Sequence, residues 1–299
     1  MLSENSKTAV RIGWIGAGVM GASMAGHLLT AGHNLFVYNR TREKANGLIA
    51  AGAQWCDDPA AVAAQCEVLF TIVGYPDDVA EIYLGPTGVI ARAGESLRFI
   101  VDMTTSRPAL AREIAATAAA KQIQALDAPV SGGDIGAREA RLAIMVGGDR
   151  ETFDAGRALF ECMGRNIAYM GPAGAGQATK LANQILVAGN MIGACEALLY
   201  AQRAGLDASA VIDVIGSGAA GSWTINNLGP RIVRRDFAPG FYIDHFIKDM
   251  GLVVEECERL ELSLPGLALV RELYLGLQRE GQGKSGTQAL MRALEGLNR

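Results

Sequence analysis

The stretch VRIGWIGAGVMGASMAGHLL, residues 10–29, sets a glycine-rich turn directly between a strand-like run and a helix-like run. The apolar run from Val10 to Ile15 predicts a buried strand, and the run from Ser23 to Leu29 predicts a helix. Between them lies the spacing GxGxxG, carried by Gly16, Ala17, Gly18, Val19, Met20 and Gly21.

Each glycine of this turn has a separate physical task. Gly16 permits a tight turn, Gly18 lets the backbone approach a pyrophosphate, and Gly21 lets the helix pack on the strand. The N–H groups at the start of the helix can bind the anion. The turn therefore predicts a dinucleotide site, with a purely structural strand-to-helix turn as the alternative.

Strand-like and helix-like runs alternate outward from this turn. The apolar runs AVRIGWIG, NLFVYN, EVLFTIV, LRFIVDM and IQALDAPV are separated by alanine-rich stretches such as SMAGHLLTAG and PALAREIAATAAAKQ. This alternation predicts a doubly wound α/β domain, a parallel sheet covered by helices on both faces. Strand signals end after NIAYMG, and the pattern is helical from about residue 173. We predict a dinucleotide-binding domain over residues 1–172 and an all-helical domain over residues 173–299.

Length and composition are typical of a soluble globular protein with two domains. The chain has 299 residues, beyond the roughly 250 at which a single core stops growing. Its net charge of −4 gives no indication of a nucleic-acid or anionic-membrane partner. The five cysteines are scattered without a CxxC pair, so we expect reduced thiols and no metal site. The polar start MLSENSKT does not resemble a signal peptide, and we expect a cytoplasmic protein.

The end of the second strand bears on the choice of dinucleotide. A site for NAD commonly has Asp or Glu there, which accepts hydrogen bonds from the ribose hydroxyls. This chain instead has Asn39, Arg40 and Thr41, followed by Arg42. An arginine fork can hold a 2′-phosphate, so the segment favours NADP, with NAD possible. Alternatively, the two arginines are only the solvated start of the next helix.

Two further loops follow predicted strands, where ligands of open parallel sheets bind. The first contains Val73, Gly74 and Tyr75, and the second contains Thr104, Thr105 and Ser106. Both are candidates to line the cofactor. The hydroxyls of the second loop could instead cap the helix that starts at Pro108.

Lys180 is an unusual cation in an apolar segment. Between Gly174 and Ala204 the only other charged residues are Glu196 and Arg203. Lys180 and Asn183 are three residues apart and share one helix face. The positive end of the helix dipole and the apolar surroundings should lower the pKa of the lysine towards the range useful for acid–base catalysis. A solvated lysine at a helix start is the alternative.

The segment DAPVSGG, residues 127–133, ends a predicted strand in a proline and a small turn. Ser131, Gly132 and Gly133 could present a hydroxyl and successive N–H groups to a carboxylate. An ordinary surface loop is the alternative.

In order and approximate spacing, IGWIGAGVMGASMAGHLL, DAPVSGG, GAGQATKLANQ and IKDMGL resemble the motifs of the β-hydroxyacid dehydrogenase family. The likeness implies a Rossmann-type domain joined by a long helix to an all-helical domain that forms dimers or tetramers. It implies a catalytic Lys180, a substrate-binding Asn183, and a carboxylate loop at Ser131, Gly132 and Gly133. It also implies cofactor contacts from Thr105 and Lys248.

The resemblance implies NAD(P)-dependent interconversion of a short 3-hydroxy acid and its semialdehyde, as in 3-hydroxyisobutyrate dehydrogenase or 2-hydroxy-3-oxopropionate reductase. Glyoxylate or succinic semialdehyde reduction is an alternative. His27, Thr104 and the segment 281–287 depart from many relatives and leave the substrate open. Relatives that reduce imines usually replace the lysine, so Lys180 counts against that activity. A non-catalytic dinucleotide-binding module is the alternative outside enzymes.

Overall fold

The structure is a computed structural model that describes residues 9–299, and the predicted polar segment 1–8 lies outside the described residues. The chain divides into two compact units, the first ending at Lys180 and the second extending from Leu181 to Arg299. The predicted domain boundary between Pro172 and Ala173 falls just before this division and remains a prediction.

The first unit is built on a nine-stranded sheet in which β1 and β4 lie side by side at the centre of the order 3-2-1-4-5-6. Strands β1 to β6 pair in parallel, whereas β8 runs antiparallel to β6 and β7 and parallel to β9. The strands are β1 (Arg11–Ile15), β2 (Asn34–Tyr38), β3 (Gln54–Trp55), β4 (Val68–Thr71), β5 (Phe99–Asp102), β6 (Gln124–Asp127), β7 (Val130–Ser131), β8 (Leu142–Gly148) and β9 (Gly164–Gly171).

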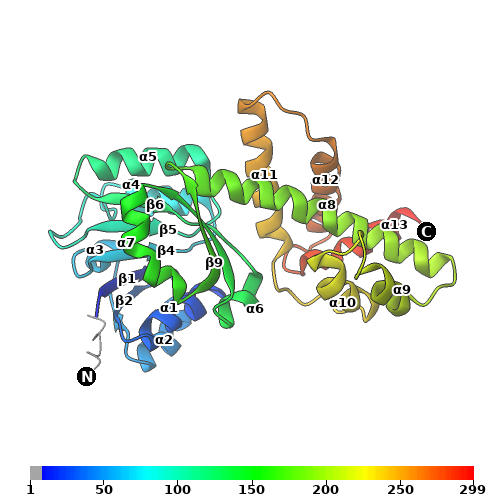
Figure 1. Cartoon of the computed structure of the whole chain (residues 1–299), viewed down its shortest axis with the longest axis horizontal. Helices are drawn as coiled ribbons and strands as arrows, with labels where there is room; N and C mark the ends of the chain where they lie inside the picture. Colours follow the sequence, from blue (N-terminus) through cyan, green and yellow to red (C-terminus); the bar gives the residue numbers. More distant parts are fainter. Residues whose placement is uncertain (1–8) are drawn as a thin grey trace, which may run out of the picture. The chain divides into compact units, whose positions relative to one another are not determined.

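Helices cover both faces of this sheet because its strands are apolar on both sides. Ile12 and Trp14 of β1 belong to a hydrophobic cluster with the buried faces of α1 and α7. Ile15 belongs to a second cluster with α3, α4 and α5. Figure 1 shows α1 and α5 on opposite sides of the sheet. The helices of this unit are α1 (Gly21–Thr30), α2 (Asn46–Ala50), α3 (Pro59–Ala63), α4 (Pro76–Leu84), α5 (Pro108–Ala119), α6 (Gly133–Arg138) and α7 (Arg150–Glu161), with a 3-10 turn at Arg42–Ala45.

The second unit is helical and has its own core. Met191 and Cys195 of α8 pack in one cluster with Phe246 and Met250 of α11 and Tyr274 of α12. The helices are α8 (Ala175–Arg203), whose first residues lie in the first unit, α9 (Ala208–Ile215), α10 (Gly229–Val233), α11 (Ile243–Arg259), α12 (Pro265–Arg279) and α13 (Leu290–Leu297), with a π-helical turn at Thr224–Leu228 and a 3-10 turn at Thr287–Ala289.

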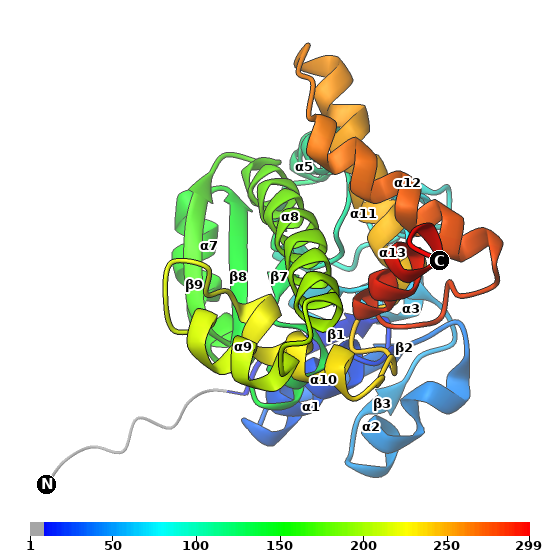
Figure 2. The same ribbon diagram turned by 90° about the vertical axis from the view of Figure 1, so that its right-hand side faces the viewer.

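Helix α8 is one uninterrupted helix of 29 residues (Figure 2). By length and composition alone it could cross a membrane, since its most apolar window has a mean hydropathy of 1.3. A core helix of a globular protein passes the same test, and Leu181, Met191 and Leu198 are buried in the core of the second unit. Core packing therefore explains part of the apolar character of α8, whose most apolar window is 39% buried.

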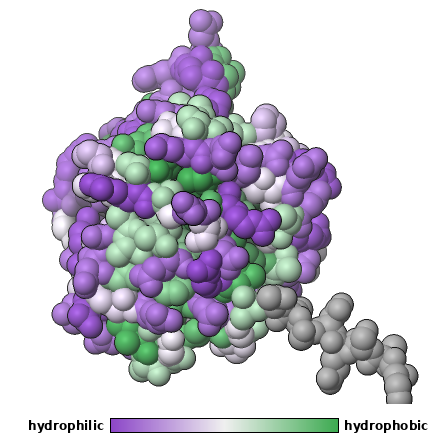
Figure 3. All heavy atoms as spheres, turned by 90° about the vertical axis from the view of Figure 1, so that its left-hand side faces the viewer, coloured by the Kyte–Doolittle hydropathy of each residue, from purple (hydrophilic) through white to green (hydrophobic). Residues whose placement is uncertain are grey.

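The surface drawn in Figure 3 is mostly hydrophilic, with small hydrophobic areas scattered between polar side chains. Such a mixture is ordinary for a protein surface in contact with water.

The predicted architecture is confirmed: a doubly wound sheet with helices on both faces precedes a helical second unit. One prediction differs in detail, because IQALDAPV is not a single strand. The run is divided at Ala128 and Pro129 into β6 and β7, and both strands pair with the antiparallel β8. Proline has no N–H for a sheet ladder, which explains why the strand stops there.

Candidate functional site

The GxGxxG turn lies between the end of β1 and the start of α1, at the point where the strand order reverses. Gly16 has a φ of +105°, and a Cβ there would lie 2.0 Å from the carbonyl oxygen of Ile72. A Cβ on Gly21 would lie 2.1 Å from the carbonyl oxygen of Gly16, so these two glycines are needed for the turn itself. A Cβ on Gly18 would meet nothing within 4 Å. Gly18 is therefore not required by packing, as expected if its open side receives a ligand.

Asn39 holds this turn from the end of β2. Its Oδ1 accepts a hydrogen bond from the N–H of Ala17 at 2.8 Å, and its Nδ2 donates to the carbonyl of Thr41 at 2.7 Å. The side chain thus joins the glycine turn to the segment that follows β2. Sequence reasoning assigned Asn39 to the cofactor, and the structure adds a second task within the protein.

The two arginines after β2 differ in their surroundings. The guanidinium of Arg42 lies over the ring of Trp55, 5.0 Å from its centre. The side chain of Arg40 is 84% exposed and forms an ion pair with Asp78 of α4 at 3.2 Å. An exposed ion pair contributes little to stability, so Arg40 can exchange this partner for a ligand phosphate at small cost.

The loops after β4 and β5 are joined by Thr104. Its Oγ1 accepts from the N–H of Val73 at 3.0 Å, and its own N–H donates to Oδ1 of Asp102 at 3.0 Å. Helix α5 has Arg107 at its N-cap, and the side chain of Arg107 makes no capping hydrogen bond there. Tyr75, at the N-cap of α4, is exposed.

The DAPVSGG segment ends in two glycines with positive φ, +138° at Gly132 and +64° at Gly133. Ser131 closes the short strand β7, and Gly133 begins α6. A side chain would be strained at both glycines, although a Cβ on Gly133 would meet nothing within 4 Å. The turn therefore leaves open space beside its backbone.

Asp127, at the end of β6, holds the start of α8. Its Oδ1 accepts from the N–H of Gly174 at 2.7 Å, and its Oδ2 accepts from the N–H of Gln177 at 2.8 Å. The carboxylate thus satisfies N–H groups that have no partner within the helix, and its charge opposes the positive end of the helix dipole. Burial raises the pKa of the Asp127 carboxyl to about 6, while these backbone N–H groups act in the opposite direction.

The side chain of Gln177 forms a second attachment. Its Oε1 accepts from the N–H of Ser106 at 2.8 Å, and its Nε2 donates to the carbonyl of Thr104 at 2.7 Å. A Cβ on Gly176 would lie 2.4 Å from the carbonyl of Met145, so the helix start approaches β8 as closely as only glycine allows. Lys180 follows on the next turn and is 7% exposed. Its backbone position is therefore fixed by two polar attachments and one close contact.

We expect the difference in unfolding free energy between the wild type and Asp127→Asn to depend on pH. Because the pKa of Asp127 in the folded protein is about 6, above the unfolded value near 3.9, the stability this carboxyl contributes is present at low pH. That contribution is lost as pH rises through 6. The wild type should lose at most about 3 kcal/mol relative to the variant between about pH 4 and pH 7. Denaturant unfolding of both proteins across this pH range measures the difference in unfolding free energy. A difference that does not change with pH would contradict the raised pKa of Asp127.

A chain of four polar side chains lies in the second unit, and its two middle members, Gln184 and Asp249, are buried. Asn183 Nδ2 donates to Gln184 Oε1 at 2.7 Å, and Gln184 Nε2 donates to Asp249 Oδ2 at 2.6 Å. The other oxygen of Asp249 lies 2.8 Å from Nζ of Lys248. Asn183 and Lys248 are both predicted site residues, and the two residues that connect them were not assigned to the site from sequence.

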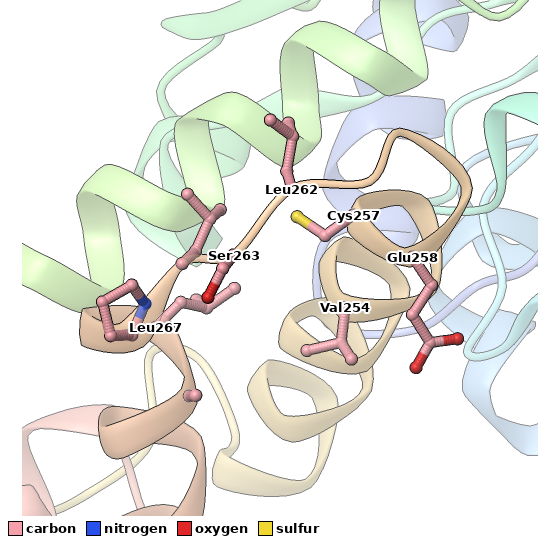
Figure 4. A pocket seen from close by; sticks show the side chains of 9 residues that line it. Val254, Cys257, Glu258, Leu262, Ser263 and Leu267 are labelled. Carbon is pink, nitrogen blue, oxygen red and sulfur yellow. The ribbon is translucent and has the colours of Figure 1, made fainter.

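A cavity of about 180 Å³ lies in the second unit between the end of α11 and the start of α12. Figure 4 shows Val254, Cys257 and Glu258 of α11 along it, with Leu262 and Ser263 on the connecting loop and Leu267 on α12. Burial raises the pKa of the Cys257 thiol, which disfavours the reactive thiolate. The cavity contains none of the predicted site residues, and we assign it no chemistry.

Within residues 9–299, no group of three or more His, Cys, Asp or Glu side chains could hold a metal ion. The glycine turn fits a dinucleotide, because Gly18 is open and the N–H groups of α1 begin beside it. The strand order 3-2-1-4-5-6 places this turn where such sheets bind dinucleotides. Fold and turn together define a dinucleotide-binding protein of the Rossmann class.

Comparison with known proteins narrows this class. Residues 11–171 match the NAD-binding domain of 6-phosphogluconate dehydrogenase, and residues 174–294 match the NAD-binding domain of NADP-dependent 3-hydroxyisobutyrate dehydrogenase. The chain belongs to the β-hydroxyacid dehydrogenase family. It is therefore an NAD(P)-dependent hydroxyacid dehydrogenase, which confirms the predicted class of enzyme and cofactor.

Three similar proteins illustrate the likeness. A protein of Arabidopsis thaliana named probable 3-hydroxyisobutyrate dehydrogenase-like 1 is 51% identical over 96% of this chain and 86% of its own length. The 2-hydroxy-3-oxopropionate reductase of Escherichia coli is 37% identical over 96% and 97%, respectively. The structure of Mycobacterium tuberculosis 3-hydroxyisobutyrate dehydrogenase with L-serine aligns with a TM-score of 0.87 at 30% identity, covering 96% of this chain and 99% of that one.

Proposed function

We propose that this enzyme interconverts a short 3-hydroxy acid and its semialdehyde, as in the 3-hydroxyisobutyrate dehydrogenase or 2-hydroxy-3-oxopropionate reductase type. The observation that carries the proposal is the burial of Lys180. This lysine lies one turn after a helix start that Asp127 attaches to β6 and Gln177 attaches to the loop after β5. A lysine whose only role was to be solvated at the start of a helix would be exposed.

We propose that Lys180 acts as the general base in oxidation and the general acid in reduction. NAD(P) supplies the hydride acceptor at C4 of its nicotinamide ring. As the C–H bond at C3 of the substrate breaks, the Lys180 amine takes the proton of the hydroxyl, and the C3–O bond becomes a carbonyl. In reduction, the ammonium of Lys180 returns that proton to the oxygen.

We propose that the turn at Ser131 binds the substrate carboxylate. A hydroxyl and the N–H groups of Gly132 and Gly133 suit an anion, and the positive φ of both glycines keeps side chains away from that backbone. Asn183 follows Lys180 by three residues on α8, so its amide emerges on the same helix face. Thr105 and Lys248 remain proposed contacts of the nicotinamide end of the cofactor.

Arg40 should favour NADP over NAD by contacting the 2′-phosphate. We expect Arg40→Ala to raise the KM for NADPH roughly 10-fold with little change for NADH, since a charge-assisted hydrogen bond is lost only with the phosphate. Steady-state kinetics with each cofactor measures this selectivity. Arg42→Ala is the matched control, because Arg42 lies against Trp55. Equal effects of both variants on NADPH would contradict the role of Arg40.

A panel of substrates tests the proposed reaction. Absorbance of the reduced nicotinamide is followed with short 3-hydroxy acids and NAD(P)⁺, and with semialdehydes or glyoxylate and NAD(P)H. We expect the highest kcat/KM for a short 3-hydroxy acid or its semialdehyde. Bound cofactor without turnover of any compound would contradict the proposal, whereas a preference for glyoxylate or succinic semialdehyde would favour that alternative.

We further propose a cytoplasmic homodimer or homotetramer formed through the helical second unit. Leu186 and Tyr200 of α8 are large apolar side chains that the described chain leaves exposed. Light scattering coupled to size-exclusion chromatography gives the assembly mass directly.

A further inference from the structure

Gln184 is a buried polar residue that the catalytic scheme does not use. Its side chain is 2% exposed and lies between two others, since it accepts from Asn183 and donates to Asp249. Asp249 is also 2% exposed and is paired with Lys248. Burying an amide and a carboxylate is unfavourable unless they find polar partners, which points to a specific task for this arrangement.

The direction of the hydrogen bonds in this chain follows from chemistry. A carboxylate accepts hydrogen bonds and cannot donate them, and Nζ of Lys248 lies 2.8 Å from Oδ1 of Asp249. Asp249 therefore requires the NH₂ end of the Gln184 amide, at the observed 2.6 Å. The carbonyl end of Gln184 must then face Asn183, which can approach it only with its own NH₂ group, at 2.7 Å.

The consequence concerns Asn183. With one N–H donated to Gln184, its amide cannot rotate by half a turn without placing two carbonyl oxygens together. Its Oδ1 and its remaining N–H are thus held at defined positions. An asparagine without this support could present either end to a ligand.

We propose that Gln184 is a positioning residue that orients the Asn183 amide so that its remaining N–H donates a hydrogen bond to the hydroxyl oxygen of the substrate, whose proton goes to Lys180. The proposal rests on the proposed function, in which Asn183 contacts the substrate. It assigns to the Lys248–Asp249 ion pair the role of setting the direction of the hydrogen-bond chain, in addition to the proposed cofactor contact of Lys248. It also predicts that the enzyme prefers ligands with a hydroxyl or carbonyl oxygen that can accept a hydrogen bond from Asn183.

A double-mutant cycle tests the proposal with Gln184→Met, Asn183→Ala and the double variant. Methionine keeps the length and volume of the side chain and removes both hydrogen bonds. We expect Gln184→Met to lower kcat/KM for the hydroxy acid roughly 10- to 100-fold with unchanged cofactor affinity. In the Asn183→Ala background the same substitution should have no further effect, because Gln184 acts through Asn183. Equal losses in both backgrounds, or no loss from Gln184→Met in the presence of Asn183, would overturn the proposal.

Gln288→Met is the matched control. Gln288 is equally buried in the same unit but donates to the backbone carbonyls of Asp236 and Ala238. Gln288→Met should lower the stability of the protein. Any effect of this substitution on kcat/KM should be the same in the presence and in the absence of Asn183.

A readout independent of turnover separates this proposal from the proposed function. The side-chain amide protons of Asn183, observed by NMR, should shift in Gln184→Met and keep their positions in Gln288→Met. Unchanged Asn183 signals in Gln184→Met would overturn the proposal. Shifted signals in a protein that turns over no hydroxy acid would support the positioning of Asn183 and contradict the proposed function.

Discussion

Replacing Lys180 with methionine is expected to reduce kcat by about 10²–10⁴-fold while NADPH still binds. Methionine fills a similar volume in this buried position but has no ionisable group. The proton of the substrate hydroxyl then has no acceptor when the hydride leaves C3. Stopped-flow kinetics gives the rate of hydride transfer, and fluorescence titration gives the affinity for NADPH.

Lys180→Arg distinguishes proton transfer from the effect of a positive charge. Arginine keeps the charge but does not lose its proton at accessible pH. We expect it to be nearly as inactive as Lys180→Met. Recovery of most of the wild-type kcat in Lys180→Arg would show that charge alone suffices, and near-normal turnover in Lys180→Met would refute the role of Lys180 altogether.

Replacing Gly18 with alanine is expected to weaken dinucleotide binding by roughly 10- to 100-fold without unfolding the protein. A Cβ at this position meets no atom of the chain within 4 Å, so the folded state has room for it. The methyl group would instead occupy the space through which the backbone approaches the pyrophosphate. Calorimetric titration with NADPH, together with the thermal midpoint of the free protein, measures both expectations.

Gly47→Ala is the control for this substitution. Gly47 lies in α2 of the same unit, and an added Cβ there also meets nothing within 4 Å. It should leave NADPH affinity unchanged. Wild-type affinity in Gly18→Ala, or an equal loss in Gly47→Ala, would show that the glycine turn is not where the pyrophosphate binds.

Local patterns made much of the fold predictable. Strands β1, β2, β4 and β5 are continuous apolar runs, and such runs have few alternatives when helices alternate with them. Strand β3 has only two residues, Gln54 and Trp55, which is too short for any periodicity to register. The antiparallel pairing of β8 depends on contacts between distant segments, which a local pattern does not contain.

The candidate site likewise has residues that local sequence predicts and residues whose roles depend on distant contacts. The glycine turn and Lys180 stand out because their residue types are unusual in their immediate surroundings. The task of Asp127 depends on backbone groups 47 and 50 residues later, and that of Gln184 on Asp249, 65 residues later. The sequence signal for Gln177 and Gln184 was the presence of a polar glutamine in an apolar helix. Their hydrogen-bond partners could be identified only in the folded structure.

Transfer of a labelled hydride tests the central claim most directly. A short 3-hydroxy acid carrying deuterium at C3 is incubated with the enzyme and NADP⁺, and the reduced cofactor is analysed by NMR. We expect deuterium at C4 of the nicotinamide in the wild type, and nearly none over the same time in Lys180→Met. Reduced cofactor without deuterium, or bound cofactor that is never reduced by any short 3-hydroxy acid, would contradict the proposal that this enzyme oxidises such acids by hydride transfer.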